Sequence, residues 1–289
     1  MFWRFHINSG QIYVVYALLI SIAWFLLNKL SKFNHLASGF FVGITAALRP
    51  PYILVLIPFL IYQQYSFLLG GIIGILFSIL LSFTVTDIFI WKKYILAMFE
   101  MTGFIDVNEY LQIGDRAAVN TDIVYPKFIE GISATIRNPL ELNNFSNSSI
   151  YDRLYALEIP NRPQVLAVGF IIVITFLALY LIRYNSRIKD INLMFLYGTL
   201  MCLIGEFFIP VGRYSYYDIQ LIVPLFIIIT IADIKQLINS RAIAILFGGL
   251  LLSIGCFNWI PKFLIFSTYL ITFYITLTSL ILLRQQKRS

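Results

Sequence analysis

The stretch GITAALRPPYILVLIP, residues 43–58, places one arginine and two consecutive prolines inside a run of apolar residues. Proline has no backbone N–H and clashes with the preceding helical turn, so a helix that enters from Gly43 is predicted to break at Pro50. If this segment lies in a membrane, the freed backbone groups and the charge of Arg49 need protein or water as partners. How the chain folds around this break therefore depends on whether the segment lies in a membrane.

The composition is that of a membrane protein. Of the 289 residues, 60% are hydrophobic and 12% are charged, whereas ordinary soluble domains carry about 25% charged residues. Runs such as residues 67–91 exceed the roughly 18 to 20 apolar residues that cross ~30 Å of hydrocarbon. Strand-like alternation is absent, so the sequence predicts an all-α fold, a polytopic transmembrane helical bundle.

Charged and metal-binding residue types exclude several function classes. The formal net charge is +7, but Lys and Arg stand mostly at the ends of apolar runs, where they orient the chain and meet lipid head groups, so no nucleic-acid partner is expected. Cys202 and Cys256 lie in separate apolar runs and read as small hydrophobes. No metal-ligand spacing and no DxD pair occurs, so we expect no metal and no cofactor.

Eight apolar segments define the domain organisation. They are residues 11–28, 36–62, 67–91, 165–184, 192–210, 218–234, 241–257 and 263–283. We interpret residues 1–91 as N-terminal membrane helices, 92–164 as an extracytoplasmic loop and 165–289 as C-terminal membrane helices. Because the tail RQQKRS and the loops RYNSRIKD and DIKQLINSR are basic, they are predicted to be cytoplasmic.

The same rule predicts that residues 36–62 form a hairpin. A single crossing would put the basic loop NKLSKFNH, residues 28–35, outside, whereas two short helices that turn at Arg49–Pro51 keep it inside. Each arm of about 12 residues would be ~18 Å long, so the tip with Arg49 would sit below the outer surface and face an aqueous pocket. The alternative is that Arg49 pairs with a neighbouring carboxylate or snorkels.

Three stretches together resemble glycosyltransferase family 87, integral membrane enzymes of the GT-C fold. They are NSGQIYVVYALLISIAWFLL (8–27), LASGFFVGITAALRPPYILVLIPFL (36–60) and YSYYDIQLIVPLFII (214–228). The matching positions are Gly10-Gln11, Gly39, Gly43, Ala46, Arg49-Pro50 and the segment from Tyr214 to Pro224. The family more often has Lys at the position of Arg49.

The resemblance also lacks one part of the family pattern. The family's N-terminal spans, and the first outer loop that carries the acidic residue thought to act as base, have no counterpart here. Topology likewise puts Met1 outside with no preceding span, so we expect a fragment of a longer protein, or else a first span that inserts as a reverse signal anchor. We expect this chain alone to bind its lipid weakly and not to transfer sugar.

The resemblance implies transfer of a sugar from a polyprenyl-phosphate donor to a cell-envelope glycan or lipid at the outer face. The partners are then the lipid-linked donor, membrane lipids and the acceptor. Such a reaction needs a base for the acceptor hydroxyl and cations that stabilise the departing phosphate. Arg49 and Arg213 are placed outside by topology, and an arginine fork can bind two phosphate oxygens. The competing interpretations are a lipid or polysaccharide transporter and a noncatalytic remnant.

Several further residues are candidates for the site. The resemblance implies substrate binding by Gln11. Glu206 is either a buried acid or base, or the ion-pair partner of Arg213 or Arg49. Asp218 is a second catalytic candidate, or simply a helix cap. The aromatic residues could stack on a sugar or prenyl chain, or form an interfacial belt; they are Tyr214, Tyr216 and Tyr217.

Overall fold

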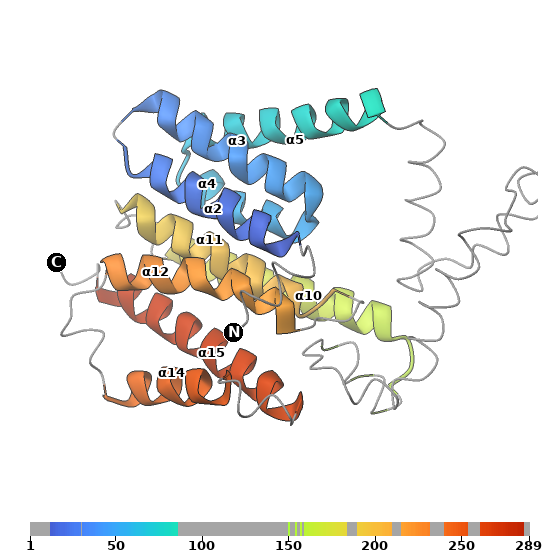
Figure 1. The fold of residues 1–289 in the computed structure, drawn as a ribbon, viewed down its shortest axis with the longest axis vertical. Helices are drawn as coiled ribbons and strands as arrows, with labels where there is room; N and C mark the ends of the chain where they lie inside the picture. Colours follow the sequence, from blue (N-terminus) through green and yellow to red (C-terminus); the bar gives the residue numbers. More distant parts are fainter. Residues whose placement is uncertain are drawn as a thin grey trace, which may run out of the picture.

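The computed structural model describes residues 12–29, 31–85, 159–183, 190–209, 215–231, 240–253 and 261–285, with single positions between 150 and 157. Every regular element in these ranges is helical (Figure 1), which confirms the predicted all-α class. Most of the predicted outer loop, through residue 149, lies outside the described residues. The elements are α2 (Tyr13–Leu27), α3 (Lys32–Leu48), η1 (Pro50–Val55), α4 (Leu56–Ile61), α5 (Tyr65–Val85), α10 (Arg162–Arg183), α11 (Ile191–Glu206), η4 (Ser215–Leu221), α12 (Ile222–Ile231), α14 (Ser240–Ser253) and α15 (Pro261–Gln285).

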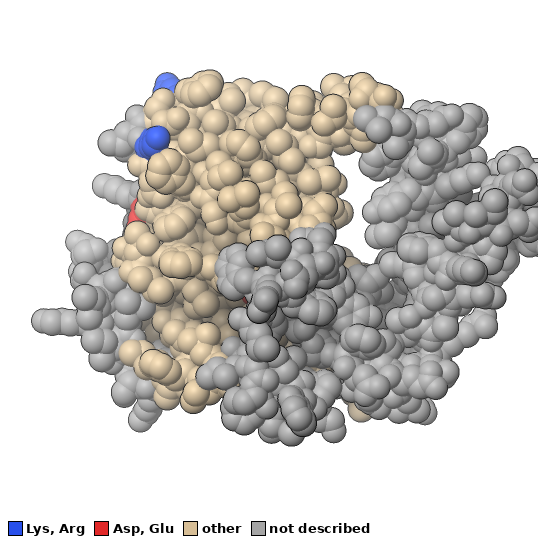
Figure 2. Space-filling view, viewed as in Figure 1, with Lys and Arg blue, Asp and Glu red and all other residues tan. Residues whose placement is uncertain are grey.

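The described helices are those of a membrane protein. Stretches in α5, α10 and α15 are long and apolar enough to cross a bilayer, namely Tyr65–Thr84, Gln164–Arg183 and Ile265–Arg284. The other predicted segments correspond to shorter apolar helices. Figure 2 shows one face on which the described surface is almost free of charge, and blue side chains appear at the end where α2 leads into α3 in Figure 1. Such a surface suits lipid contact and would be costly in water.

Helices α3 and α5 pack in parallel at very short distance. A Cβ on Gly39 would lie 1.9 Å from the backbone oxygen of Phe67, and one on Gly43 would lie 2.1 Å from that of Gly71. The partner numbers rise together, so the two helices run in the same direction. Small residues allow this approach, which is the usual way in which helices gain van der Waals contact when lipid provides no hydrophobic driving force.

The segment between these helices runs back against them. Leu56 packs on Gly71, and the rings of Phe59 and Phe67 stack with centroids 3.7 Å apart. Here the partner numbers fall as the chain number rises, so α4 is antiparallel to α5. Residues 32–61 thus form a helix and a return arm that reverse at Arg49.

The reversal is caused by the two prolines. Residues that precede proline avoid the α region, and Arg49 is extended with φ −143° and ψ 97°. The return arm begins as the 3-10 helix η1, with both prolines in its first turn, where a missing N–H costs no helical hydrogen bond. The first arm has 17 residues and is longer than the sequence predicted, because its helix starts at Lys32 and includes polar residues of the preceding loop.

Helix α11 forms the centre of the bundle. Thirteen of its 16 residues are buried, and it contacts α2, η1, α4, α10, α12 and α15; in Figure 1 it crosses the middle of the fold in yellow. A helix that is apolar and buried all round belongs in a core rather than at a surface. Its first turn is tied to α2 by a hydrogen bond of 2.8 Å from Trp24 Nε1 to Asn192 Oδ1. Its last turn therefore lies at the opposite end of the bundle, beside the reversal at Arg49.

The packing of α3 on α5 predicts that an alanine is tolerated less well at Gly39 than at Gly248, which lies in α14. Gly39→Ala should lower the melting temperature of the detergent-solubilised protein, because its methyl group meets backbone atoms that cannot rotate away, and overpacking of this kind costs about 1 to 3 kcal/mol. Gly248→Ala is the matched control, since the nearest atom to its Cβ, in Leu270, is 3.9 Å away. Equal melting temperatures for the two variants would contradict the described packing.

Candidate active site

The backbone around Arg49 positions its side chain at the end of α3. The Arg49 N–H donates to the carbonyl of Thr45 at 2.8 Å, and the Arg49 carbonyl accepts from the N–H of Tyr52 at 3.1 Å. Both backbone groups of the break are therefore satisfied within the protein, as a position in the membrane requires. Arg49 thus caps the end of α3 and the start of η1, and its two backbone hydrogen bonds hold in place the Cα from which the side chain extends.

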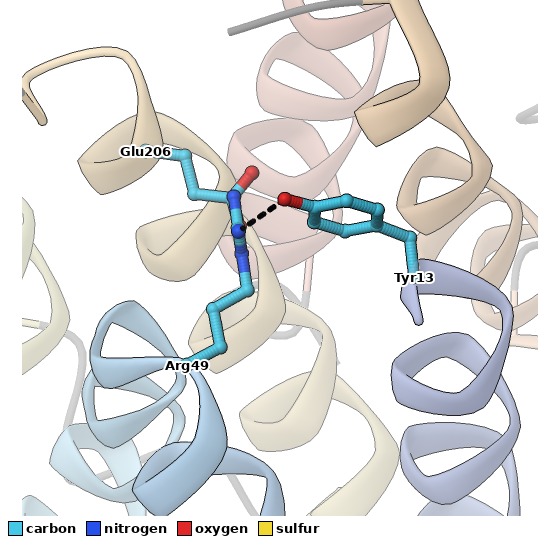
Figure 3. A network of polar contacts seen from close by, with 3 residues as sticks. All are labelled: Tyr13, Arg49 and Glu206. Carbon is cyan, nitrogen blue, oxygen red and sulfur yellow. Dashed lines mark hydrogen bonds and ion pairs between the residues drawn. The ribbon is translucent and has the colours of Figure 1, made fainter. Parts of the chain in front are cut away.

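The arginine forms an ion pair with the last residue of α11. Nε of Arg49 donates to Oε1 of Glu206 at 2.7 Å (Figure 3). The Glu206 side chain has no exposed surface, whereas 14% of the Arg49 side chain is exposed. A solute can therefore reach the cation but not the carboxylate. Of the interpretations open for Glu206 from the sequence, the structure shows the pairing with Arg49.

Tyr13, in the first turn of α2, contacts the other side of the guanidinium. Nη1 of Arg49 donates to the hydroxyl of Tyr13 at 3.2 Å, and the guanidinium carbon lies 4.8 Å from the centre of the Tyr13 ring. Figure 3 shows the arginine between the tyrosine and the glutamate. An aromatic ring at this distance stabilises a cation electrostatically. The start of α2, the end of α3 and the end of α11 thus converge on one positive group.

Gln220 in η4 completes the described cluster. When its amide nitrogen is directed toward the carboxylate, this nitrogen lies 2.9 Å from Oε1 and 3.3 Å from Oε2 of Glu206 and 3.1 Å from the hydroxyl of Tyr52, so its two N–H groups can donate to the carboxylate and to Tyr52. This orientation follows from the partners, because the amide oxygen would otherwise face acceptors. Gln220 and Tyr52 are both buried, and the ring of Tyr52 lies 6.4 Å from that of Tyr16 in α2.

Sequence analysis missed Tyr13, Tyr52 and Gln220. A buried amide within the apolar run YDIQLIVP was a usable signal, because a polar side chain inside a membrane helix needs a partner. Tyr52 directly follows the prolines, and Tyr13 stands two residues after the candidate Gln11. Neither tyrosine can be told from an interfacial aromatic residue by sequence pattern alone.

The other site residues predicted from the sequence lie in η4 or outside the described residues. Asp218 lies in η4 and its Oδ2 accepts a hydrogen bond of 2.5 Å from the hydroxyl of Thr268 in α15, so it ties these two elements together. The backbone of Tyr217 is part of η4. Three predicted positions lie outside the described residues, namely Gln11, Arg213 and Tyr214. Within the described ranges, no group of three or more His, Cys, Asp or Glu residues is arranged to hold a metal ion.

Comparison with known proteins assigns the chain to a family. The sequence model of glycosyltransferase family 87 matches residues 1–205, which is more than half of the chain. This chain belongs to glycosyltransferase family 87. The family indicates a membrane glycosyltransferase with a sugar donor and an acceptor as substrates. The matched region includes Tyr13 and Arg49 and ends one residue before Glu206. No curated protein and no solved structure matches the chain.

The ion pair of this family 87 member predicts non-additive effects on stability. Arg49→Ala leaves the buried Glu206 without its cationic partner, and removal of one member of a buried pair costs about 3 to 5 kcal/mol in soluble proteins. The double variant Arg49→Ala/Glu206→Gln removes the stranded charge, so it should melt at a higher temperature than Arg49→Ala alone. Thermal denaturation in detergent measures the melting temperatures of both variants. A double variant that melts at a lower temperature than Arg49→Ala would contradict the pairing.

Proposed function

We propose that this protein transfers a sugar from a polyprenyl-phosphate donor to a glycan or lipid of the cell envelope, and that Arg49 binds the donor phosphate. The observation that supports this most is the partly exposed guanidinium of Arg49, held from behind by a fully buried carboxylate at one end of an apolar bundle. A cation in that position suits an anion that arrives on a lipid, because the prenyl chain can occupy the membrane while the phosphate stays at the bundle end.

The chemistry needs a fixed positive charge at the leaving group. As the sugar departs, negative charge grows on the phosphate oxygens, and preorganised donors stabilise that charge in a site from which water is largely excluded. The guanidinium presents a planar fork that matches two phosphate oxygens. Glu206 and Tyr13 hold the fork from two sides, so little reorganisation is needed when the donor binds.

Glu206 serves best as the residue that orients Arg49. Its side chain has no exposed surface, so an acceptor hydroxyl cannot contact it in this conformation, and general-base catalysis requires hydrogen-bond contact with the proton to be removed. Asp218 is half-buried and held by Thr268. We therefore assign Glu206 to positioning and keep Asp218 as the catalytic candidate among the described residues.

The same geometry supports a wider proposal. We propose a multi-pass bundle of the GT-C type in the cell membrane, with the Arg49 end toward the outer face. The turn between α2 and α3 lies at the opposite end and carries Lys29 and Lys32, which favours a cytoplasmic position for that end. Substrates would then meet where the predicted outer loop leaves and re-enters the bundle.

The proposal is tested by binding of a polyprenyl phosphate to the protein in nanodiscs, with the uncharged polyprenol as reference ligand. The variant Arg49→Ala/Glu206→Gln, which removes both charges together, should weaken phosphate binding ~10- to 100-fold, the effect of losing charge-assisted hydrogen bonds. Arg49→Lys should retain part of the affinity, because the charge remains without the fork. Binding of polyprenol should be the same in all three proteins.

Trp24→Phe is the control for the helix packing. It removes the hydrogen bond to Asn192 that joins α2 and α11 at the other end of the bundle, so it affects the same two helices without touching Arg49. Its phosphate affinity should equal that of the wild type. Unchanged phosphate binding in Arg49→Ala/Glu206→Gln would refute the assignment of Arg49.

A further inference from the structure

We propose that Gln220 is a positioning residue that holds the Glu206 carboxylate while Arg49 binds the donor phosphate. This inference rests on the proposed function, in which the phosphate and Glu206 both use the same guanidinium. The carboxylate and the phosphate share one cation, so the negative charge of Glu206 is less fully compensated once the phosphate also draws on the guanidinium. A buried carboxylate that shares its cation in this way needs other hydrogen-bond donors.

Gln220 is placed to supply such donation. Its amide nitrogen lies 2.9 Å from Oε1 and 3.3 Å from Oε2 of Glu206, so it faces both oxygens of the carboxylate. Arg49 approaches one of them, Oε1, at 2.7 Å. These hydrogen bonds of the amide nitrogen go to Glu206 and Tyr52, so they do not depend on the guanidinium.

Burial makes this donation important. The Glu206 side chain is fully buried and Gln220 is 3% exposed, so water cannot easily replace a donor that Glu206 loses. A buried carboxylate that loses part of its partners is costly, and hydrogen bonds to charged groups are among the strongest in proteins. Donation from Gln220 therefore lowers the free-energy cost of sharing the charge of Arg49 with a phosphate.

The position of Gln220 is fixed from two further sides. Its amide nitrogen also lies 3.1 Å from the hydroxyl of Tyr52, which stands three residues after Arg49 in η1. Two residues before Gln220, Asp218 anchors η4 to α15 through Thr268. Gln220 thus connects the arm that carries Arg49 to the helix that carries Glu206, and it does so from an element that is itself held to the bundle.

The test compares Gln220→Met in two backgrounds. Methionine has a similar length but no N–H donor. In the otherwise wild-type protein, Gln220→Met should weaken binding of polyprenyl phosphate about tenfold, the effect of one hydrogen bond to a charged group. In the Glu206→Gln background no buried charge needs Gln220, so the same substitution should change affinity by less than about twofold, since neutral hydrogen bonds contribute less. Polyprenol binding should not change in any of these proteins.

A purely structural role gives a different result. If Gln220 only packs η4 against the bundle, Gln220→Met weakens binding equally in both backgrounds, or weakens polyprenol binding as much as phosphate binding; either result overturns the inference. Trp24→Phe, which removes a hydrogen bond at the opposite end of the bundle, is the control and should leave phosphate affinity unchanged. If Gln220→Met does not fold, Gln220→Leu is used in the same comparison.

The outcome separates this inference from the proposed function. Normal phosphate affinity in Gln220→Met, together with loss of affinity in Arg49→Ala/Glu206→Gln, refutes the role of Gln220 alone. Normal affinity in Arg49→Ala/Glu206→Gln refutes the role of Arg49 as the phosphate-binding residue, whatever Gln220→Met shows.

Discussion

The ion pair between Arg49 and Glu206 joins two residues that are 157 positions apart in the chain, and the geometry of the site depends on it. A membrane interior cannot tolerate an isolated charge, so the arginine and the glutamate must meet within the fold. That requirement places the reversal between α3 and η1 against the last turn of α11. The prolines determine where the reversal occurs, and the ion pair determines what it packs against.

Packing between backbones provides the rest of the framework. In lipid, apolar side chains gain little by associating with one another, so the helices depend on close approach and on internal hydrogen bonds. The glycines of α3 and α5 bring two parallel helices into backbone contact, and the short return arm then lies against both α5 and α11. The arm is thereby held on two sides, which keeps Arg49 at a fixed height in the bundle.

The sequence predicts the class of fold and the location of the break well, because both follow from local chemistry. Apolar runs of spanning length predict helices in a membrane, and the Arg-Pro-Pro triplet predicts a break in the helix at Pro50. The membership of glycosyltransferase family 87 could also be predicted, and two of the three stretches that carry the resemblance lie within the matched residues 1–205.

The partners within the site could not be predicted in the same way. Predicting that Arg49 pairs with Glu206 requires the packing of α11 on η1, which no local pattern encodes. Gln220 and Tyr52 are ordinary polar and aromatic residues until the fold buries them beside the carboxylate. The length of α3 was underestimated for a different reason, because a helix can continue beyond the hydrophobic layer into polar residues such as Lys32.

The central claim is that one buried carboxylate positions an arginine that receives a lipid-linked phosphate. An experimental structure of the protein with a bound polyprenyl phosphate, determined by electron cryo-microscopy in a nanodisc, tests it most directly. The account predicts the phosphate in hydrogen-bond contact with the Arg49 guanidinium, with Glu206 still in contact with Gln220. A phosphate bound elsewhere, with Arg49 and Glu206 paired as they are without the lipid, would contradict it.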